Sequence, residues 1–371
     1  MTSRRTLLLG GGAVVAAGVG VTWIVSRDTG SLKDYQAAVA SMRATLQRTP
    51  EIGEIIRCAT LAPSGHNAQP WRFQATGDRI EILPDIARRT PVVDPDDHHL
   101  FVSLGCAAET LSLASGATGR PGELRPELAD RGAIVFDFGP GTATSSPLSD
   151  AITRRQSTRG DYDGRAVNTA ELRALAVAAA VPGVDLILVT DRTVIGRIRD
   201  LVIEGNLSQM GDPAFLRELR HWMRFSPREA LRTGDGLFSA TSGHPVLPEW
   251  LGRGAFDLAF TASTENDTYA RQIASSAGFA VFVGHEADPP HWVSVGRAAQ
   301  RFGLQATVLG LKTAFLNQPV EVAALRPALA ELVGLRGRRP DLVMRFGAGA
   351  ARPFSARRPV RDVWVEGAHS V

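Results

Sequence analysis

The segment LAPSGHNAQPWRF, at residues 61–73, combines turn residues with hydrogen-bonding side chains. Turn chemistry alone accounts for the Pro-Ser-Gly run at 63–65. It does not account for Asn67 and Gln69, because alternate side chains of an extended segment point to the same side. Each carboxamide carries both donors and an acceptor. The pair therefore offers several hydrogen-bonding groups in one direction, directly after an apolar helical stretch.

A second polar pattern begins the stretch AITRRQSTRGDY, from residue 151. Arg155, Ser157 and Arg159 alternate, which places two guanidinium groups and a hydroxyl on one side of an extended segment. A phosphate monoester needs a charge-assisted clamp of this kind. The alternation therefore favours phosphate binding over a solvated basic surface. Further arginines beside this pattern and near the C-terminus are Arg154, Arg357 and Arg358.

The stretch DPDDHHLF places His98 and His99 close to Asp94, Asp96 and Asp97, which raises the question of a metal site. Neighbours on one short segment cannot easily converge on one ion, and no second cluster is evident in the sequence. The sequence therefore argues against a metal site at this position.

Five short, apolar and β-branched stretches predict strands. They alternate with helical patterns, so we expect an α+β fold of the α/β/α type, with a central sheet covered by helices. The stretches lie at residues 78–85, 133–139, 184–191, 278–285 and 341–349.

Two segments of the chain are similar to each other. Residues 102–119 and 293–310 align without a gap and share Val-Ser-x-Gly-x-Ala-Ala. Glycine, small residues and leucine at helical spacing predict two tightly packed, buried helices. Two such helices can converge on one pattern, but the shared Val-Ser-x-Gly entry favours an internal duplication. We therefore expect two homologous halves, at residues 35–150 and 151–371.

The second half carries an insertion that the first half lacks. It falls at about residues 205–275 and includes HWMRFSPREALRTGDGLFSATSGHPVLPEW, which indicates an irregular segment. Long insertions inside compact domains are commonly lids or binding loops. We therefore expect a lid in the second half.

The overall composition excludes nucleic acid as an expected partner. The chain has 371 residues, and 41 Lys and Arg against 38 Asp and Glu give a formal net charge of +3. Such a balance produces no large uniform field. Cys58 and Cys106 both lie in apolar helical patterns, which favours buried, inert thiols over a disulfide.

The N-terminus has the layout of a targeting segment. Arg4 and Arg5 precede an uncharged run at residues 7–25, and their order resembles a bacterial twin-arginine export signal. A plain membrane anchor is the alternative, because the run is just long enough to span a bilayer. We expect residues 1–30 to be a signal or anchor that uses the twin-arginine translocation machinery. The protein would then be periplasmic, extracytoplasmic or membrane-anchored, and cytoplasmic if the signal is not used.

Taken together, these motifs resemble the nitroreductase superfamily of FMN-binding proteins, and within it the fused single-chain branch related to mycobacterial Acg. The resemblance covers nearly all of the chain after residue 35. It implies that the R-x-S-x-R pattern at 155–159 holds the FMN phosphate and that Arg357 and Arg358 close on it. It also implies that a P-S-x-x-N-x-Q-P-W segment lies along the isoalloxazine ring. The residues that match this segment are Pro63, Ser64, Asn67, Gln69, Pro70 and Trp71.

The two motifs stand in different halves of the chain. In two-subunit relatives, as the resemblance implies, each motif comes from a different subunit. The fused chain is then expected to be a monomer that mimics the usual homodimer, with one composite FMN site. Asn67 and Gln69 would face a flat heterocycle and hydrogen-bond its carbonyl oxygens and N3–H.

His66 occupies a variable position of the motif, beside the implied ring. It is a candidate catalytic residue that donates a hydrogen bond or a proton to substrate or flavin. A turn residue that faces solvent is the alternative, and the sequence leaves both open.

Two functions follow from the resemblance. The first is an FMN-dependent oxidoreductase that takes electrons from NAD(P)H or another donor and reduces a nitro, quinone or similar small-molecule acceptor at flavin N5. The second is an FMN-binding or sequestering protein whose lid blocks turnover. The sequence separates them poorly, because both would share one fold and one cofactor.

Overall fold

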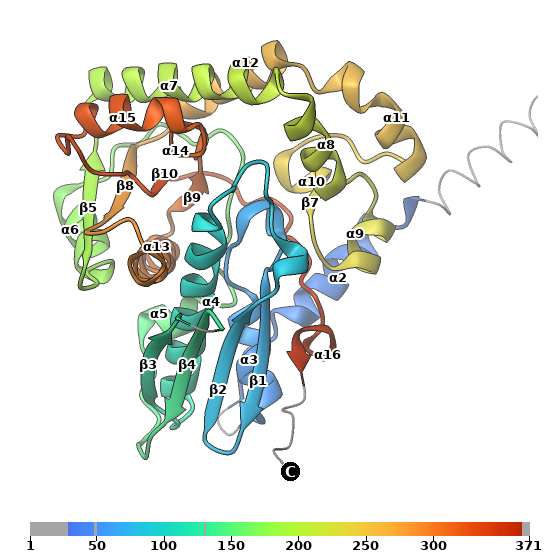
Figure 1. Cartoon of the computed structure of the whole chain (residues 1–371). Helices are drawn as coiled ribbons and strands as arrows, with labels where there is room; N and C mark the ends of the chain where they lie inside the picture. The colour runs from blue at the N-terminus through green and yellow to red at the C-terminus, as the bar shows by residue number, and fades with distance from the viewer. Residues whose placement is uncertain (1–28, 48–49, 130, 366–371) are drawn as a thin grey trace, which may run out of the picture.

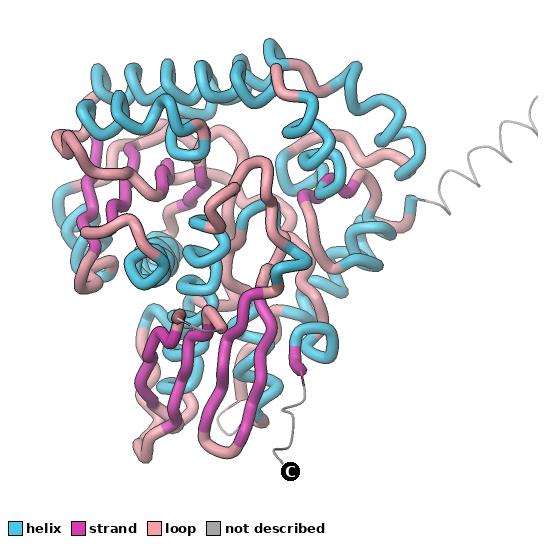
Figure 2. The backbone as a smooth tube through the Cα atoms, in the orientation of Figure 1, coloured by secondary structure: helices cyan, strands magenta, loops and turns pink. Residues whose placement is uncertain are grey.

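Two mainly antiparallel sheets organise the chain (Figures 1 and 2). The computed structural model describes residues 29–47, 50–129 and 131–365, so the expected signal or anchor lies almost wholly outside the described residues. The first sheet has the strand order β11-β1-β2-β4-β3, and the second has the order β5-β8-β10-β9. The strands of the first sheet are β1 (Trp71–Thr76), β2 (Arg79–Pro84), β3 (Gly122–Glu127), β4 (Ala133–Phe138) and β11 (Trp364–Val365). Those of the second are β5 (Val184–Val189), β8 (Gly278–Gly284), β9 (Lys312–Phe315) and β10 (Leu342–Gly347), while β6 (Met223–Arg224) and β7 (Leu237–Phe238) form a separate parallel pair.

All five predicted strands are confirmed, as β2, β4, β5, β8 and β10. The expectation of one central sheet is wrong, because the strands of the two halves pair within separate sheets. Two long helices, α4 (His98–Ala117) and α13 (Pro289–Val308), occupy the space between these sheets (Figure 1). Each helix is apolar over much of its surface and buries one side against its own sheet and another against its partner helix.

The two sheets share one connectivity. In each, an antiparallel pair is followed by a 20-residue helix and then by two strands whose order in the sheet is reversed. The strands β1, β2, β3 and β4 thus correspond in order to β5, β8, β9 and β10. This arrangement is the one that a duplication would leave, and the common origin of the halves stays a prediction.

Helices α4 and α13 cross at two glycines that meet the partner backbone reciprocally. A Cβ atom on Gly105 would lie 2.1 Å from the carbonyl oxygen of Val293, and one on Gly296 would lie 2.0 Å from that of Val102. Only glycine allows two helix backbones to approach so closely. The aligned Val-Ser-x-Gly motifs therefore fix the helix crossing that joins the two sheets.

The segment between β5 and β8 is mainly helical, so the expectation of an irregular insertion is wrong. Good helix starts explain this: Asp212, Ser226 and Thr261 each accept a hydrogen bond from a backbone N–H of the first turn. Its helices are α7 (Arg192–Met210), α8 (Pro213–Trp222), α9 (Pro227–Thr233), α10 (Ser239–Ser242), α11 (Glu249–Ala259) and α12 (Ala262–Ala274). Helices α8 to α11 gather on one side of the molecule (Figure 1), and we call residues 213–274 the covering segment.

The remaining helices cover the sheets and tie the chain ends to the first half. The hydroxyl of Tyr35 on α2 donates to the carbonyl of Phe354 and accepts from the N–H of Ala356, and β11 pairs with β1. These helices are α2 (Leu32–Met42), α3 (Ile52–Thr60), α5 (Pro147–Ala151), α6 (Thr169–Ala178), α14 (Gln318–Glu321), α15 (Arg326–Leu332) and α16 (Val360–Val363). Short 3-10 turns are η1 (Gly65–Asn67), η2 (Ile86–Arg88) and η3 (Ala323–Leu325).

Two further expectations concern burial. Cys58 and Cys106 are free and buried, as predicted. Among the described residues, α4 is long and apolar enough to cross a membrane, but most of it is buried inside the protein.

Candidate functional site

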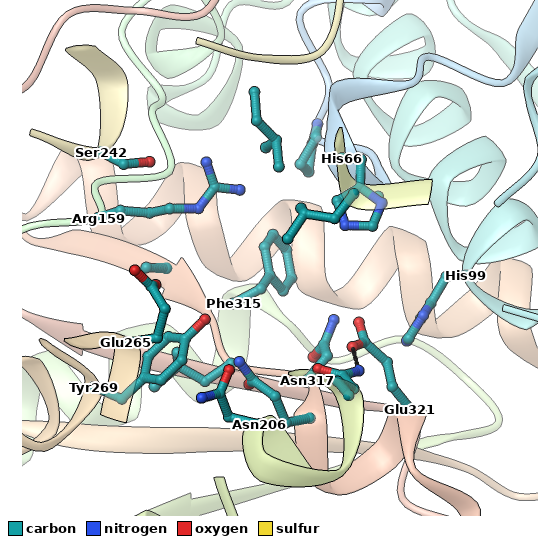
Figure 3. A pocket seen from close by; sticks show the side chains of 18 of the residues that line it. His66, His99, Arg159, Asn206, Ser242, Glu265, Tyr269, Phe315, Asn317 and Glu321 are labelled. Carbon is teal, nitrogen blue, oxygen red and sulfur yellow. Dashed lines mark hydrogen bonds between the residues drawn. The ribbon is translucent and has the colours of Figure 1, made fainter. Parts of the chain in front are cut away.

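A chamber of about 230 Å³ is lined by residues from both halves of the chain (Figure 3). The first half contributes residues 63–66 and one face of α4, and the second contributes Arg159 together with parts of α7, β9 and α14. The covering segment closes the remaining side through α8, β7, α10 and α12. Of the predicted site residues, the chamber wall includes Pro63, Ser64, His66 and Arg159.

Arg159 extends its guanidinium group into the chamber (Figure 3). No hydrogen bond or ion pair to another described residue satisfies this group. Burial lowers the pKa of Arg159 from its ordinary value. An enclosed cation without a counter-charge is unfavourable, so Arg159 is suited to bind an anionic or carbonyl group of a ligand.

His66 faces the chamber and not bulk solvent (Figure 3). It has a φ of 48°, in the left-handed region that few non-glycine residues adopt. Burial, and then the nearby Arg159 and His99, lower the pKa of His66 to about 4. The neutral imidazole can hydrogen-bond a ligand at neutral pH, but it carries no acidic imidazolium proton there.

The expectation that residues 67 and 69 lie on an extended segment is wrong. Residues Gly65–Asn67 form the 3-10 turn η1, and Asn67 and Gln69 each have a φ of 54°. Both side chains are buried and bond to protein groups instead of facing the chamber. Asn67 Nδ2 donates to the carbonyls of Gly236 and Ala356, at 3.1 and 3.2 Å.

Gln69 is satisfied in the same way. Its Nε2 donates to the carbonyl of Gly234 at 2.9 Å, and its Oε1 accepts the backbone N–H of Arg358 at 2.9 Å. The two carboxamides therefore tie the turn at 65–69 to the covering segment and to the C-terminal segment.

The role of Asn67 leads to a testable expectation. Its Oδ1 accepts from Arg357 Nη1 at 2.8 Å, so Asn67→Ala removes three hydrogen bonds that join the turn to the covering segment and to the C-terminal segment, and it leaves the buried carbonyl of Gly236 without this donor. We expect this change to lower the free energy of unfolding by about 2 kcal/mol, measured by urea denaturation. An unchanged free energy of unfolding would show that these hydrogen bonds do not hold the turn in place.

Three buried arginines meet beside the chamber. Arg155 Nη2 donates to the carbonyl of Leu61 at 2.8 Å, and Arg357 donates to the carbonyls of Thr60, Leu61 and Ala62. Arg43 Nη1 donates to the carbonyls of Thr153 and Arg155, at 3.0 and 3.1 Å. No carboxylate among the described residues pairs with these three guanidinium groups, which we call the arginine cluster.

The charges of the arginine cluster act on one another. Burial lowers the pKa of Arg155 to about 10 and, with the repulsion of Arg155, lowers that of Arg357 to about 9. The pKa of Arg43 falls well below its ordinary value through burial and the repulsion of Arg357 and Arg155. The Nε atoms of Arg43 and Arg155 are buried without a hydrogen-bond partner. The carbonyl oxygens at the end of α3 accept several hydrogen bonds from these guanidinium groups. They do not neutralise the positive charge of the cluster, which an anion could offset.

The other predicted phosphate ligands lie apart from the chamber. Arg154 is exposed, and its neighbours form a separate surface depression. Ser157 forms an isolated parallel bridge with Thr313. Arg358 donates to the carbonyl of Gln69 and to the carboxylate of Asp85. The pattern 155–159 is therefore divided, with Arg155 in the arginine cluster and Arg159 in the chamber.

Ion pairs between side chains hold the covering segment against the first half. Asp235 pairs with Arg88 of the first half and with Arg224 at 2.6 Å. Both arginines lower the pKa of the Asp235 carboxyl, against the opposing effect of burial. Together with the hydrogen bonds from Asn67 to Gly236 and from Gln69 to Gly234, these ion pairs hold the covering segment over the chamber.

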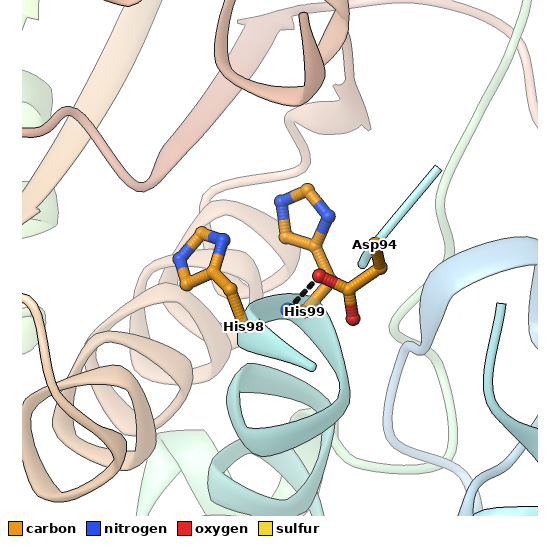
Figure 4. Close-up of side chains that lie close together, drawn as sticks. All are labelled: Asp94, His98 and His99. Atoms are coloured by element: carbon orange, nitrogen blue, oxygen red, sulfur yellow. Dashed lines mark hydrogen bonds between the residues drawn. The ribbon is translucent and has the colours of Figure 1, made fainter. Parts of the chain in front are cut away.

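Asp94, His98 and His99 come together at the start of α4 (Figure 4). One possible ligand atom of each lies within 4.8 Å of the others, so the argument that these neighbours cannot converge is wrong. The helix start folds Asp94 back over the histidines: its two oxygens accept the N–H groups of His99 and Leu100. His98 Nε2 lies 3.0 Å from a carboxylate oxygen of Asp341. These contacts account for the cluster as a polar link between the halves.

Comparison with known proteins gives relatives but no family model that matches. "Putative NAD(P)H nitroreductase Rv3131" of Mycobacterium tuberculosis is 28% identical over 319 residues, which are 83% of this chain and 88% of that protein. "Putative NAD(P)H nitroreductase acg" of the same species is 23% identical over 340 residues, 87% of this chain and 98% of that protein. Over most of its length the chain is similar to proteins named as putative NAD(P)H nitroreductases, Acg among them.

Solved structures of the nitroreductase superfamily match part of this chain. The FMN-dependent nitroreductase NfnB from Mycobacterium smegmatis is 14% identical, covers 60% of this chain and 94% of its own, and has a TM-score of 0.38. An FMN-bound nitroreductase from Desulfitobacterium hafniense is 13% identical, covers 58% and 96%, and has a TM-score of 0.37.

Three residues at this site were not predicted from the sequence. Arg43 lies in SMRATLQRT, which lacks the R-x-S-x-R pattern, and only the fold brings it to Arg155 and Arg357. Glu265 and Glu321 line the chamber from α12 and α14. Neither acid belongs to one of the predicted site motifs, and only the fold brings the two to one chamber.

Proposed function

We propose that this protein is an FMN-dependent oxidoreductase of nitroreductase type that reduces a nitro, quinone or similar small-molecule acceptor. The observation that carries this proposal is the arginine cluster, a buried set of cations without a described carboxylate, next to a chamber that holds the free guanidinium of Arg159. Cys106 lines the chamber and also influences the pKa of Arg155, so the two features adjoin. The relatives named as NAD(P)H nitroreductases support NAD(P)H as a possible electron donor.

The residues present fit FMN at two places. Arg155, Arg357 and Arg43 would hold the phosphate, because three buried donors with unsatisfied charge match a dianion. Residues 63–66 and Arg159 would contact the ring, and Arg159 would offset the negative charge of its reduced form. Bound FMN would supply hydride chemistry at N5. The carboxamides of Asn67 and Gln69, in contrast, position the chamber wall and not the ring.

A second candidate function is FMN binding or sequestration with little NAD(P)H turnover. The contacts that fasten the covering segment favour it, because Asp235 is held by Arg88 and Arg224 and both carboxamides bond across the same junction. A nicotinamide ring must reach the flavin to reduce it, and a covering segment that stays closed would prevent this.

One experiment separates these functions. Protein lacking residues 1–30 is purified, and its absorbance is recorded before and after anaerobic NADPH. A flavin band that bleaches supports the oxidoreductase, and a flavin band that stays oxidised supports sequestration or a different donor. Absence of flavin, even after reconstitution with FMN, would overturn both.

Arg159→Gln tests the ring contact in the same preparation. We expect FMN to be retained but its reduction potential to fall, because the cation that offsets the reduced ring is gone. The potential is measured by anaerobic dye equilibration. Arg120→Gln is the matched control, since that half-exposed arginine packs on Phe138, outside the chamber wall. Equal reduction potentials in the two variants would show that Arg159 does not contact the flavin ring.

We further propose that the protein is a monomer exported through a twin-arginine-type signal. One chain supplies both sheets and both sides of the chamber, which supports the monomer. Export in the folded state would suit a protein that must be loaded with its cofactor first. Light scattering during gel filtration and fractionation of cells that express the full chain test the two parts.

A further inference from the structure

Glu265 is a buried acid in the chamber wall, and the proposed contacts to FMN do not involve it. It stands in the first turn of α12, on the covering segment, with only 8% of its surface exposed, and it lines the chamber (Figure 3). The carboxyl group has no hydrogen-bond or ion-pair partner among the described residues. A buried carboxyl group without a partner is unfavourable, so a site that keeps one has room for a ligand atom opposite it.

The surroundings of Glu265 favour the neutral carboxylic acid. The chamber walls around it include the apolar side chains of Phe238, Phe260 and Phe315. Burial raises the pKa of Glu265 above its ordinary value. A carboxylic acid that is neutral at working pH can donate a hydrogen bond and a proton.

Tyr269 places a second O–H group on the same side of α12. Residues four positions apart on a helix lie one above the other. Tyr269 also lines the chamber, and the pKa of its hydroxyl is raised by burial and by Glu265 and lowered by Arg159. Two O–H donors on one helix therefore line the same chamber as the Arg159 guanidinium.

We propose that Glu265 is the catalytic acid that gives a proton to an oxygen atom of the bound electron acceptor, with Tyr269 as a second hydrogen-bond donor to that acceptor. This inference rests on the proposed function and names the two residues that would donate to the oxygen atoms of its acceptor.

The step balances for a quinone. The quinone receives a hydride, which is two electrons and a proton, from the reduced flavin of the proposed function. Its oxygen takes one further proton as the O–H bond of Glu265 breaks, and the product is the hydroquinone. Glu265 is left as a carboxylate and regains a proton from water.

A purely structural role for Glu265 is the alternative, because an acid in the first turn of a helix interacts favourably with the helix dipole. That role requires the charged carboxylate, whereas proton donation requires the neutral acid. The pH at which Glu265 ionises therefore separates the two.

The first test is infrared spectroscopy of the purified protein across pH, with and without FMN. Wild type is expected to keep the carbonyl band of a protonated carboxylic acid at pH values above the ordinary range of a glutamate, and Glu265→Gln removes this part of the band. Asp267→Asn is the matched control, because Asp267 is exposed on the same helix and its loss should leave the band unchanged. Absence of such a band, or a band that Glu265→Gln does not alter, would overturn the proposal. The infrared measurement needs neither FMN nor turnover, so it tests Glu265 even if the proposed function is wrong.

The second test is steady-state reduction of a benzoquinone by the FMN-loaded protein. Glu265→Gln is expected to lower kcat about 100-fold with little change in KM, since general acids contribute 10²–10⁴-fold. Wild-type kcat should fall as pH rises through the pKa of Glu265, and the variant should lose this limb of the profile. Glu265→Asp should restore part of the rate. Equal rates and profiles in wild type and Glu265→Gln would overturn the assignment, whereas wild-type protein that binds FMN but reduces no acceptor would overturn the proposed function.

Discussion

Gly296→Ala is expected to destabilise this protein by about 3 kcal/mol or more, although alanine normally stabilises a helix. In a solvent-exposed helix the same change gains up to about 1 kcal/mol. Here the new Cβ would lie 2.0 Å from the carbonyl oxygen of Val102, a backbone atom that cannot turn aside. Helices α4 and α13 must then separate, and overpacking of a rigid core costs about 1–3 kcal/mol, occasionally more. The free energy of unfolding is measured by urea denaturation.

Gly196→Ala supplies the control for that experiment. Gly196 lies within α7, and a Cβ there would meet no atom within 4 Å. We expect it to stabilise the protein, so the two substitutions should have opposite signs. If Gly296→Ala stabilises as well, the close approach of the two helices is not present in solution.

The same helix crossing shows what the sequence can reveal. The repeat at 102–119 and 293–310 identified both glycines, because a tight helix contact demands small residues at fixed spacing. The five strongest strands were equally clear from their β-branched runs. Strand β3 was not, since GELRPE carries three charged residues and a proline and is mostly exposed, so no hydrophobic pattern marks it.

The sequence predicted which residue types form the candidate site, but not where their side chains point. The alternation of Asn67 and Gln69 suggested an extended segment, yet the backbone turns through left-handed conformations at both positions. The partners that stabilise this turn, at residues 234–236 and 356–358, are far away in the sequence. Local periodicity carries no information about contacts of that kind. The same limit applies to Arg43, whose neighbours in the arginine cluster come from two other segments.

Arg155→Ala is expected to weaken FMN binding by a factor of about 10 to 100. One charge-assisted hydrogen bond is worth about 1.5–3 kcal/mol, and each 1.4 kcal/mol is a tenfold change in the dissociation constant. The free energy of unfolding of the FMN-free protein, in contrast, should not fall. The carbonyl of Leu61 keeps a donor in Arg357 at 3.2 Å, and the repulsion that lowers the pKa of Arg357 and Arg43 is relieved. The FMN-free variant should therefore be about as stable as wild type, or more stable.

Arg154→Ala tests whether any such loss is specific. Arg154 is adjacent in sequence and equally charged, but it is exposed and lies outside the arginine cluster. The dissociation constant is measured by quenching of flavin fluorescence, and the unfolding of the FMN-free proteins is followed by circular dichroism. Weaker binding in Arg155→Ala alone, with stability preserved, is the result that an anion site requires. If both variants bind FMN like wild type, the three arginines serve to satisfy the end of α3, and the phosphate must be held elsewhere.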